Sequence, residues 1–486
     1  MTSDRAAEFS ESALGKTFPI PLWKTLRIHS LSMALWILCS FVSAMGQSAE
    51  RHEGSEPQHA GHEMAVVSMT NTVTGGPFRT IQAVGSGTSL APATTPAHMR
   101  HFMAGKWMLM FHGDLKAGLN DQGGPRGVTK AESQNWIMAM GERPVGIGRL
   151  MLRGMFAAEP LTAPHGGFPQ LFQTGETYRA APIIDAQHPH DLFMELAASY
   201  TVPLSERVSF HLYGGPVAEP ALGPVAFMHR ASAMENPAAP LGHHMQDSTH
   251  ISDGVVTAGV TVWRFRLESS VFRGKEPDEN RKDIELGKLD SWSARAWFTP
   301  TPDWALQFSR GHLIEPDALK LGDESRTTAS ISHNRAWSEG YWASSLIWGR
   351  NDTKGHGISN SYLLESTLNV RSKNYLYTRV ELVDKSLLFL PNVFNRPGRF
   401  STIGANLRAD PIDLTPRHHF LPALGAGRVR AYTLGGVRDL YADSQWRVGI
   451  GSDVTFYHVP PAGRLGYDTG PISFHLFLRV RPGKLL

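Results

Sequence analysis

Two segments of the chain concentrate histidine and aspartate closely enough to bind a metal ion. The first holds His188, His190 and Asp191, and the second runs from His229 to residue 253. Imidazole is the commonest protein ligand for copper and zinc ions, and a carboxylate can complete the set. The alternative is that these histidines only form hydrogen bonds. The candidate metal ligands of the two segments are His188, His190, Asp191, His243, His244 and His250.

Softer ligands lie on a segment that alternates like a β-strand. Met108, Met110 and His112 are two residues apart, so they share one face of a strand, and Met151 and Met155 would join them from a strand nearby. Thioether sulfur together with imidazole suits copper, and ligands on adjacent strands could pass an ion along a wall. The alternative is that these methionines fill gaps in packing.

A third group of ligands lies in residues 47–98, a polar segment with no sustained periodicity. This composition predicts a flexible N-terminal arm. The arm contains His52, His59, His62 and Met64, which could fold around a copper ion. The alternative is a solubilising tail that happens to contain histidine.

A different chemistry would follow from His250 and Ser252, which share one face at the entry to a strand. A histidine beside a serine can activate the hydroxyl for acyl transfer. The pair resembles the His-x-Ser pairing of outer-membrane phospholipases and lipid A deacylases. Those enzymes need a third, orienting residue about a strand later, where this chain has Arg264, Arg266 and Glu268.

The elements that would position these groups are β-strands. The clearest stretch is 289–383, and within it Glu365, Thr367, Asn369 and Arg371 alternate with apolar residues at period two. A helix would scatter the two sets around its axis, whereas a strand keeps them on opposite faces. The stretch therefore predicts amphipathic strands.

From His101 onward the same pattern predicts about 16 strands, within a range of 14–18. Seven tight turns join strands in pairs, near residues 143, 204, 263, 301, 339, 372 and 443. Longer connections separate the pairs, at 113–132, 157–190, 215–253, 275–289, 313–325, 351–360, 386–426 and 458–469. This alternation is typical of an all-β, transmembrane up-and-down antiparallel β-barrel with short periplasmic turns and long extracellular loops.

The two strand faces predict which side meets lipid. Trp292, Ala294 and Ala296 oppose Ser293 and Arg295, and other strands repeat this division. A barrel of 16 strands is too wide for side chains to fill, so its polar face would line an aqueous lumen whose arginine excess favours anions. The alternatives are that these arginines pair with carboxylates along the wall, and that loops folding inward change the selectivity of the pore. The predicted lumen residues include Arg295, Glu365, Arg379, Glu381, Arg447 and Asp453.

The N-terminus predicts export. Basic residues precede an apolar run from Leu31 to Ala44, which is shorter than the roughly 20 residues of a membrane span. We therefore divide the chain into a signal peptide at 1–46, the arm at 47–98 and the barrel at 99–486. The single Cys39 excludes an intrachain disulfide. The formal net charge of +3, with no basic run, excludes nucleic acid as a partner.

The segments from Gly167 to Tyr178 and from Gln187 to Glu195 resemble an uncharacterised family of bacterial outer-membrane β-barrel proteins. This resemblance covers most of the chain from about residue 100 and implies no established activity. The chain departs from such barrels by ending in Leu486 where they have a terminal phenylalanine. The arm is more loosely similar to copper-resistance outer-membrane proteins of the B type.

Together these observations predict a channel or porin-like protein of the bacterial outer membrane that handles copper or another transition metal. The alternatives are a lipid acyl hydrolase that uses His250 and Ser252, and a general anion-favouring porin with no metal role. TonB-dependent uptake needs a 22-strand barrel with a plug, and thus a longer chain. The expected partners are outer-membrane lipids, the barrel-assembly machinery and small solutes or metal ions, with a homotrimer as the expected assembly. Beyond copper or zinc ions, no cofactor is indicated.

Overall fold

The computed structural model describes residues 85–385 and 427–483. The predicted signal peptide, Cys39, the His/Met group of the arm and the predicted connection at 386–426 lie outside these residues. Within the described residues, no helix is both long and apolar enough to cross a membrane.

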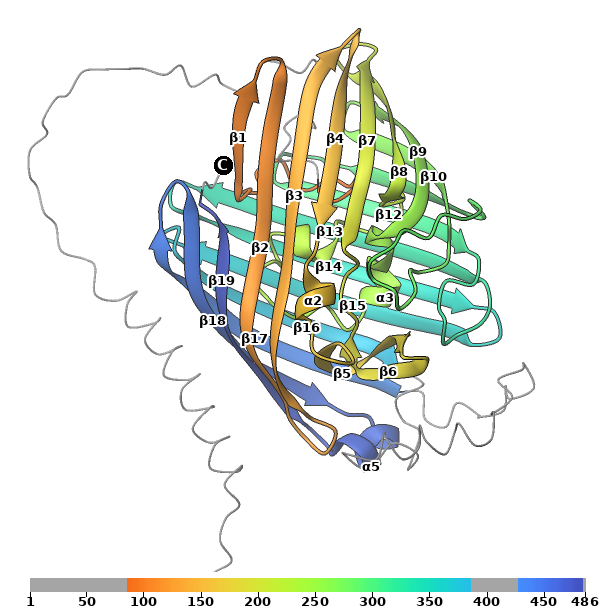
Figure 1. The fold of residues 1–486 in the computed structure, drawn as a ribbon, viewed down its shortest axis with the longest axis vertical. Helices are drawn as coiled ribbons and strands as arrows, with labels where there is room; N and C mark the ends of the chain where they lie inside the picture. Colours follow the sequence, from red (N-terminus) through yellow and green to blue (C-terminus); the bar gives the residue numbers. More distant parts are fainter. Residues whose placement is uncertain (1–84, 386–426, 484–486) are drawn as a thin grey trace, which may run out of the picture. The chain divides into compact units, whose positions relative to one another are not determined.

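The described residues form a closed barrel of sixteen antiparallel strands (Figure 1). Each barrel strand pairs with the next along the chain, and β19 returns to pair with β2, from Val480 opposite Leu115 to Ser473 opposite Gln122. Closure leaves the sheet without a free edge. The strands are β2 (Trp107–Gln122), β3 (Thr129–Val145), β4 (Gly148–Phe156), β7 (Phe193–Pro203), β8 (Val208–Ala218), β9 (Ser252–Val262), β10 (Phe265–Phe272), β11 (Ser291–Phe298), β12 (Trp304–Leu313), β13 (Glu324–Trp337), β14 (Gly340–Thr353), β15 (Gly357–Val370), β16 (Asn374–Lys385), β17 (Gly427–Ala442), β18 (Trp446–His458) and β19 (Ile472–Pro482).

Smaller elements accompany the barrel. Strand β1 (Met99–Ala104) pairs with the first half of β2, and β5 (Phe168–Tyr178) pairs with β6 (Ala181–Gln187) in a separate hairpin. Figure 1 shows this hairpin and two of the short helices within the outline of the barrel. The helices are α2 (Glu159–Thr162), α3 (His243–Gln246) and α5 (Arg464–Tyr467), with 3₁₀ turns at Phe227–His229, Ser248–His250 and Pro461–Gly463.

The number of strands and the seven tight turns are as the sequence predicts, whereas three predicted boundaries are wrong. The expected connection at 351–360 is a tight turn between Thr353 and Gly357. The expected connection at 113–132 is mostly strand, because β2 continues to Gln122. The expected first strand contains a turn at Gly105, whose φ of 60° suits glycine.

The outward face of the barrel is apolar. On β11, Trp292 is 46% exposed, whereas the side chain of Arg295, which points inward, is 2% exposed. Each barrel strand except β7 carries an exposed large apolar residue, such as Leu267, Phe308 or Leu346. Exposed aromatic residues gather near the tight turns, as in the belt of a membrane barrel: Trp263, Phe265, Trp304, Trp337, Trp342, Tyr441 and Trp446.

Besides the β5–β6 hairpin, which contacts β2 and β16, two chain segments lie inside the barrel. One is the connection between β8 and β9, residues 219–251, here called the inner loop. Its Gly223 amide donates to Ser309 Oγ of β12 at 2.9 Å, and its Leu241 amide donates to Glu381 Oε1 of β16 at 2.6 Å. The other segment is 85–98, from the predicted arm, where the Gly87 carbonyl accepts a hydrogen bond from Arg153 of β4. Thr94 Oγ1 of this segment also donates to the Asn334 carbonyl of β13 at 2.7 Å. Because the contacts of each segment reach strands far apart in the sheet, both segments cross the interior.

The filled interior corrects the expectation of a wide aqueous lumen with hydrated charges. The six predicted lumen residues face inward, but each is buried to 8% exposure or less. The sequence allowed for loops that fold inward but did not show which connection does so. The inner loop is rich in alanine, proline and glycine, and its residues are almost wholly buried.

Candidate functional site

Arg230 attaches the inner loop to the barrel wall. Its Nε donates to Glu365 Oε1 of β15 at 2.7 Å, and its Nη1 donates to Asp247 Oδ2 at 2.5 Å. Although burial opposes ionisation of Asp247, the charge of Arg230 holds the pKa of that carboxyl well below its ordinary value. Glu365 also lies 3.7 Å from Arg379 Nε of β16. Arg230 therefore joins two carboxylates, one on the wall and one on the inner loop.

The other predicted lumen charges also have partners. Arg295 Nε lies 3.1 Å from Glu268 Oε2, and Arg447 Nη1 lies 2.8 Å from Asp439 Oδ2. Asp453 accepts hydrogen bonds from Tyr377 and His475, at 2.8 Å and 2.7 Å. The inward arginines thus stabilise the wall and its contents instead of lining an open positive pore.

Glu219, the first residue of the inner loop, should make barrel stability depend on pH. Burial raises its pKa to about 7, although Arg295, whose Nη1 lies 3.6 Å from Glu219 Oε1, opposes the shift. The folded state therefore binds more protons than the unfolded state between the ordinary value of 4.5 and about 7, and stability falls as the pH rises through this window.

Replacing Glu219 with Gln should remove up to about 3 kcal/mol of this pH dependence. The measurement is the free energy of unfolding in denaturant at pH 4.5 and pH 7.5, with Glu339→Gln, in the exposed turn between β13 and β14, as control. An equal slope in the Glu219→Gln and unmodified proteins would contradict the assignment.

The fold brings the two predicted histidine groups together. His188, His190, His243, His244 and His250, here called the histidine cluster, form a chain of rings whose neighbouring centroids lie between 5.2 and 5.7 Å apart. The segment before β7 supplies two of them, and α3 with the turn before β9 supplies the others. This geometry agrees with the prediction that the two connections, which flank one hairpin, bring their histidines together.

Three rings of the cluster have one nitrogen fixed by an acceptor. His190 Nδ1 lies 2.9 Å from Glu159 Oε2, His243 Nδ1 lies 2.7 Å from Asp247 Oδ1, and His250 Nδ1 lies 2.8 Å from the carbonyl oxygen of Asp247. Within the described part of the chain, His250 Nε2 is buried without a hydrogen-bond partner. Metal-binding histidines are commonly oriented in this way, with the second nitrogen facing the ion.

Burial lowers the pKa values of His243 and His250 below the ordinary value. Both rings are therefore neutral at neutral pH, which is the form that binds metals. His188 is a weaker candidate ligand, because its two nitrogens lie 3.0 Å from Glu176 Oε1 and 3.1 Å from the Pro189 carbonyl. Asp191 Oδ1 lies 3.5 Å from Arg281 Nη1, so this carboxylate is paired with an arginine.

The histidine cluster is not a closed metal site as it stands. Among the described residues, the group whose ligand atoms lie within 4.8 Å of one another is Asp278, Asp283 and Glu285, between β10 and β11. This acidic group is partly exposed, and exposed carboxylates often cluster without an ion. Three ring nitrogens of the histidine cluster would have to approach further to bind one ion together.

The predicted Met108, Met110 and His112 face inward on β2, and β3 extends this surface with methionines that the sequence analysis missed. Met110 is in register with Met140, and His112 with Met138, whose sulfur lies 3.0 Å from His112 Nε2. The alternation of Met138 and Met140 with Ile137 and Ala139 is the signal that could have revealed them.

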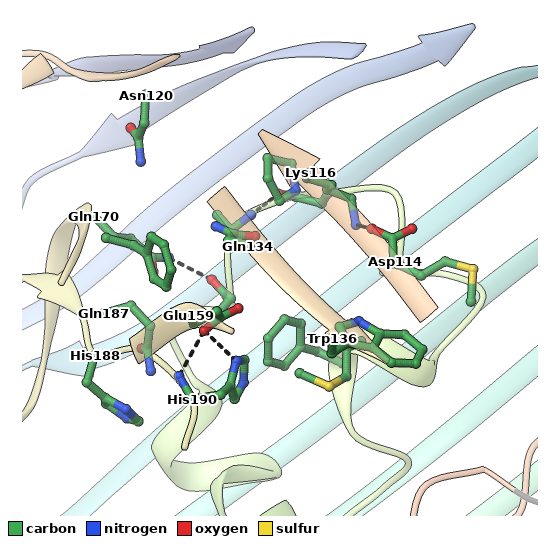
Figure 2. A pocket seen from close by; sticks show the side chains of 18 of the residues that line it. Asp114, Lys116, Asn120, Gln134, Trp136, Glu159, Gln170, Gln187, His188 and His190 are labelled. Atoms are coloured by element: carbon green, nitrogen blue, oxygen red, sulfur yellow. Dashed lines mark hydrogen bonds and ion pairs between the residues drawn. The ribbon is translucent and has the colours of Figure 1, made fainter. Parts of the chain in front are cut away.

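Three adjacent cavities follow this side of the barrel interior. A cavity of about 20 Å³ adjoins the histidine cluster and shares His188 and His190 with a second cavity of about 50 Å³ (Figure 2). The second shares Trp136 and Met228 with a third, of about 80 Å³, that His112 and Met138 line. A cavity of 10–15 Å³ can already hold a water molecule, whereas organic ligands need several hundred. These spaces suit ions and a few waters.

Figure 2 shows His190 turned toward Glu159 at one side of the second cavity, with Trp136 across from them. Asp114 and Lys116 of β2 form an ion pair on the same wall. Asp114 thus pairs with Lys116 and Glu159 with His190, while the aromatic ring of Trp136 faces the space.

The predicted hydrolase pair is not formed. Ser252 Oγ donates to the carbonyl oxygen of Thr249 at 3.0 Å, and His250 Nδ1 is directed to the Asp247 carbonyl. Ser252 is also buried. A serine that donates its proton to the backbone is not activated by the neighbouring imidazole.

No family model and no curated protein matches the chain. The similarity of the arm to copper-resistance proteins therefore gains no support. Similar solved structures are outer-membrane expressed OmpT of Vibrio cholerae (10% identity, TM-score 0.40, covering 79% of this chain and 100% of that one) and an anion-selective porin from Comamonas acidovorans (9%, 0.42, 77% and 99%). A third is Salmonella typhi OmpF in complex with daunomycin (8%, 0.44, 78% and 100%). At these TM-scores the likeness carries no argument about function, and the fold rests on the strand pairing of this chain.

Proposed function

We propose that this protein is an outer-membrane channel, porin-like in its barrel but narrowed by its inner loop to the size of ions. The observation that carries the proposal is the combination of an apolar outer surface around a closed barrel with a series of small cavities inside it. An apolar exterior of this extent requires a lipid environment. The signal peptide, delivery by the barrel-assembly machinery and a homotrimeric assembly belong to the same proposal.

The size of the cavities supports ions, and not larger solutes, as what the channel passes. The three cavities have volumes of about 20, 50 and 80 Å³, which would exclude sugars and peptides. This argues against a general anion-favouring porin with the inner loop in place. Paired arginines also leave little net positive field for anion selection.

We further propose that transition-metal ions are the solute. The observation favouring them is the orientation of His190, His243 and His250, whose Nδ1 atoms are fixed while His250 Nε2 is unpartnered among the described residues. Imidazoles with fixed second nitrogens suit copper or zinc. Weak binding along a path would allow an ion to enter and leave.

The test is planar-bilayer recording on the purified full-length protein. We expect a stable conductance well below that of an open sixteen-strand pore, and a reduction of current by micromolar Zn²⁺ that a chelator reverses. A correctly folded barrel that remains silent would contradict the channel, and a current indifferent to Zn²⁺ or Cu²⁺ would contradict the metal role.

A further inference from the structure

We propose that the largest of the three cavities is a binding site for a soft monovalent metal ion, Cu⁺ or Ag⁺. The proposal rests on the channel function only for how the ion arrives; binding itself can be tested separately. The cavity, here called the methionine chamber, lies between the wall strands β1–β4 and the inner loop. The candidate donors around it are Met99, Met138, Met140, Met151, Met228, Met234, His98, His112 and His229.

The strand register explains why sulfur and nitrogen meet there. Met99 of β1 is opposite His112 of β2, His112 is opposite Met138 of β3, and Met138 is opposite Met155 of β4. Partners in an antiparallel sheet point to the same side, so these four side chains form one inward row. Met140 belongs to the next row, opposite Met110.

The inner loop supplies donors from the other side. The His229 ring lies 5.5 Å from the His112 ring, centroid to centroid, and Met228 precedes it in the same 3₁₀ turn. His112 Nε2 already lies 3.0 Å from Met138 Sδ. A nitrogen and a sulfur from different strands thus converge before any ion is added, with a further imidazole facing them.

Packing alone does not account for this concentration. The chain has 17 methionines, and none follows Met245, so strands β9–β19 contain none. Those strands also pack against the inner loop, for example at Ser309, Glu365 and Glu381. If methionine served only to fill gaps against the loop, it would occur around the whole wall. Instead six methionines border one cavity.

The electrostatics favour a single positive charge. Thioether and neutral imidazole are uncharged, soft ligands that prefer Cu⁺ and similar ions to hard divalent ones. Two arginines also border the chamber, and both are paired: Arg153 Nε lies 3.1 Å from Glu195 Oε1, and Arg481 Nη1 lies 2.9 Å from Glu235 Oε1. The carboxylate that borders the chamber, Asp114, is likewise paired, with Lys116, so the chamber offers little to offset a double charge.

The test uses Ag⁺, which needs no reductant, on the full-length protein in detergent. We expect Met138→Leu combined with Met228→Leu to lose one equivalent of bound Ag⁺ relative to the unmodified protein, or to bind it at least tenfold more weakly by isothermal titration. Leucine retains the volume and apolar character of methionine, so the barrel should fold. Ligands in the N-terminal arm are common to both proteins and cancel in the comparison.

The matched control is Met245→Leu, which changes a buried methionine of α3 that does not border the chamber. It should bind Ag⁺ like the unmodified protein, and X-ray absorption should show Ag–S contacts whose number per protein falls only in the chamber variant. Unchanged Ag⁺ binding by the chamber variant would overturn the inference, whatever its conductance. If the unmodified protein conducts no ions but the chamber variant still loses its bound Ag⁺, the metal site stands and only the proposed channel function is overturned.

Discussion

Replacing Arg230 with alanine is expected to raise the single-channel conductance of the barrel several-fold. Arg230 is buried and bridges Glu365 of the wall to Asp247 of the inner loop. Removing one member of a buried ionic group leaves unpaired charge and costs about 3–5 kcal/mol. The backbone pairing of the closed barrel does not depend on this bridge, so the inner loop should leave the wall while the strands persist.

The measurement is conductance in planar bilayers, after folding has been verified by the heat-sensitive migration of the barrel in gels. Arg335→Ala is the control, because Arg335 is 71% exposed in its pair with Asp303 and should contribute little. Glu365→Gln offers a second way to weaken the bridge with almost no change in volume. Folded Arg230→Ala and Glu365→Gln barrels that both conduct like the unmodified protein would refute a restricting inner loop.

The second large effect concerns the histidine cluster. A variant with His190, His243 and His250 all changed to Gln is expected to bind one Zn²⁺ or Cu²⁺ ion fewer per barrel than the unmodified protein. The three rings border one cavity, whereas glutamine is a poor ligand for either ion. Equilibrium dialysis with metal analysis measures the bound equivalents.

Glu159→Gln probes the orientation of His190 without removing a ligand. Because Glu159 Oε2 lies 2.9 Å from His190 Nδ1, this change should weaken binding of the same Zn²⁺ or Cu²⁺ ion by about 10–100-fold. His333→Gln serves as control, since His333 packs against Trp304 and Trp342, away from the histidine cluster. Equal metal content in the triple variant and the unmodified protein would exclude the cluster as a metal site.

The faces of the strands were predictable because alternation depends only on residue type. Trp292 and Arg295 differ by an odd number of positions, so a strand must place them on opposite sides, as it does. The turn at 354–356 was not predictable in the same way. There Asp352, Lys354 and His356 read as a polar loop, yet β14 and β15 continue to Thr353 and from Gly357. Strand ends that project beyond an apolar belt meet water on both faces, and their alternation disappears.

The sequence predicted which residues could form the candidate sites, but not which of them would contact one another. The sequence places His190 and His243 in different connections, and only the folded inner loop decides that both come close to His250. It likewise marks Arg379 and Glu365 as inward, but the buried Arg230 beside them comes from a segment that reads as an external loop. Sequence periodicity identifies the strands of the barrel wall but does not show which segments fill the interior.

The inner loop also has a consequence for the closure of the barrel. Glu235 of the loop pairs with Arg479 and Arg481 of β19, the strand that closes the sheet against β2. Before the loop enters, water inside a sixteen-strand barrel would solvate both guanidinium groups, and entry of the loop exchanges that water for Glu235. The loop therefore ties the closing strand to the contents of the barrel, so a barrel with residues 219–251 in place should open less readily at its seam than one without them.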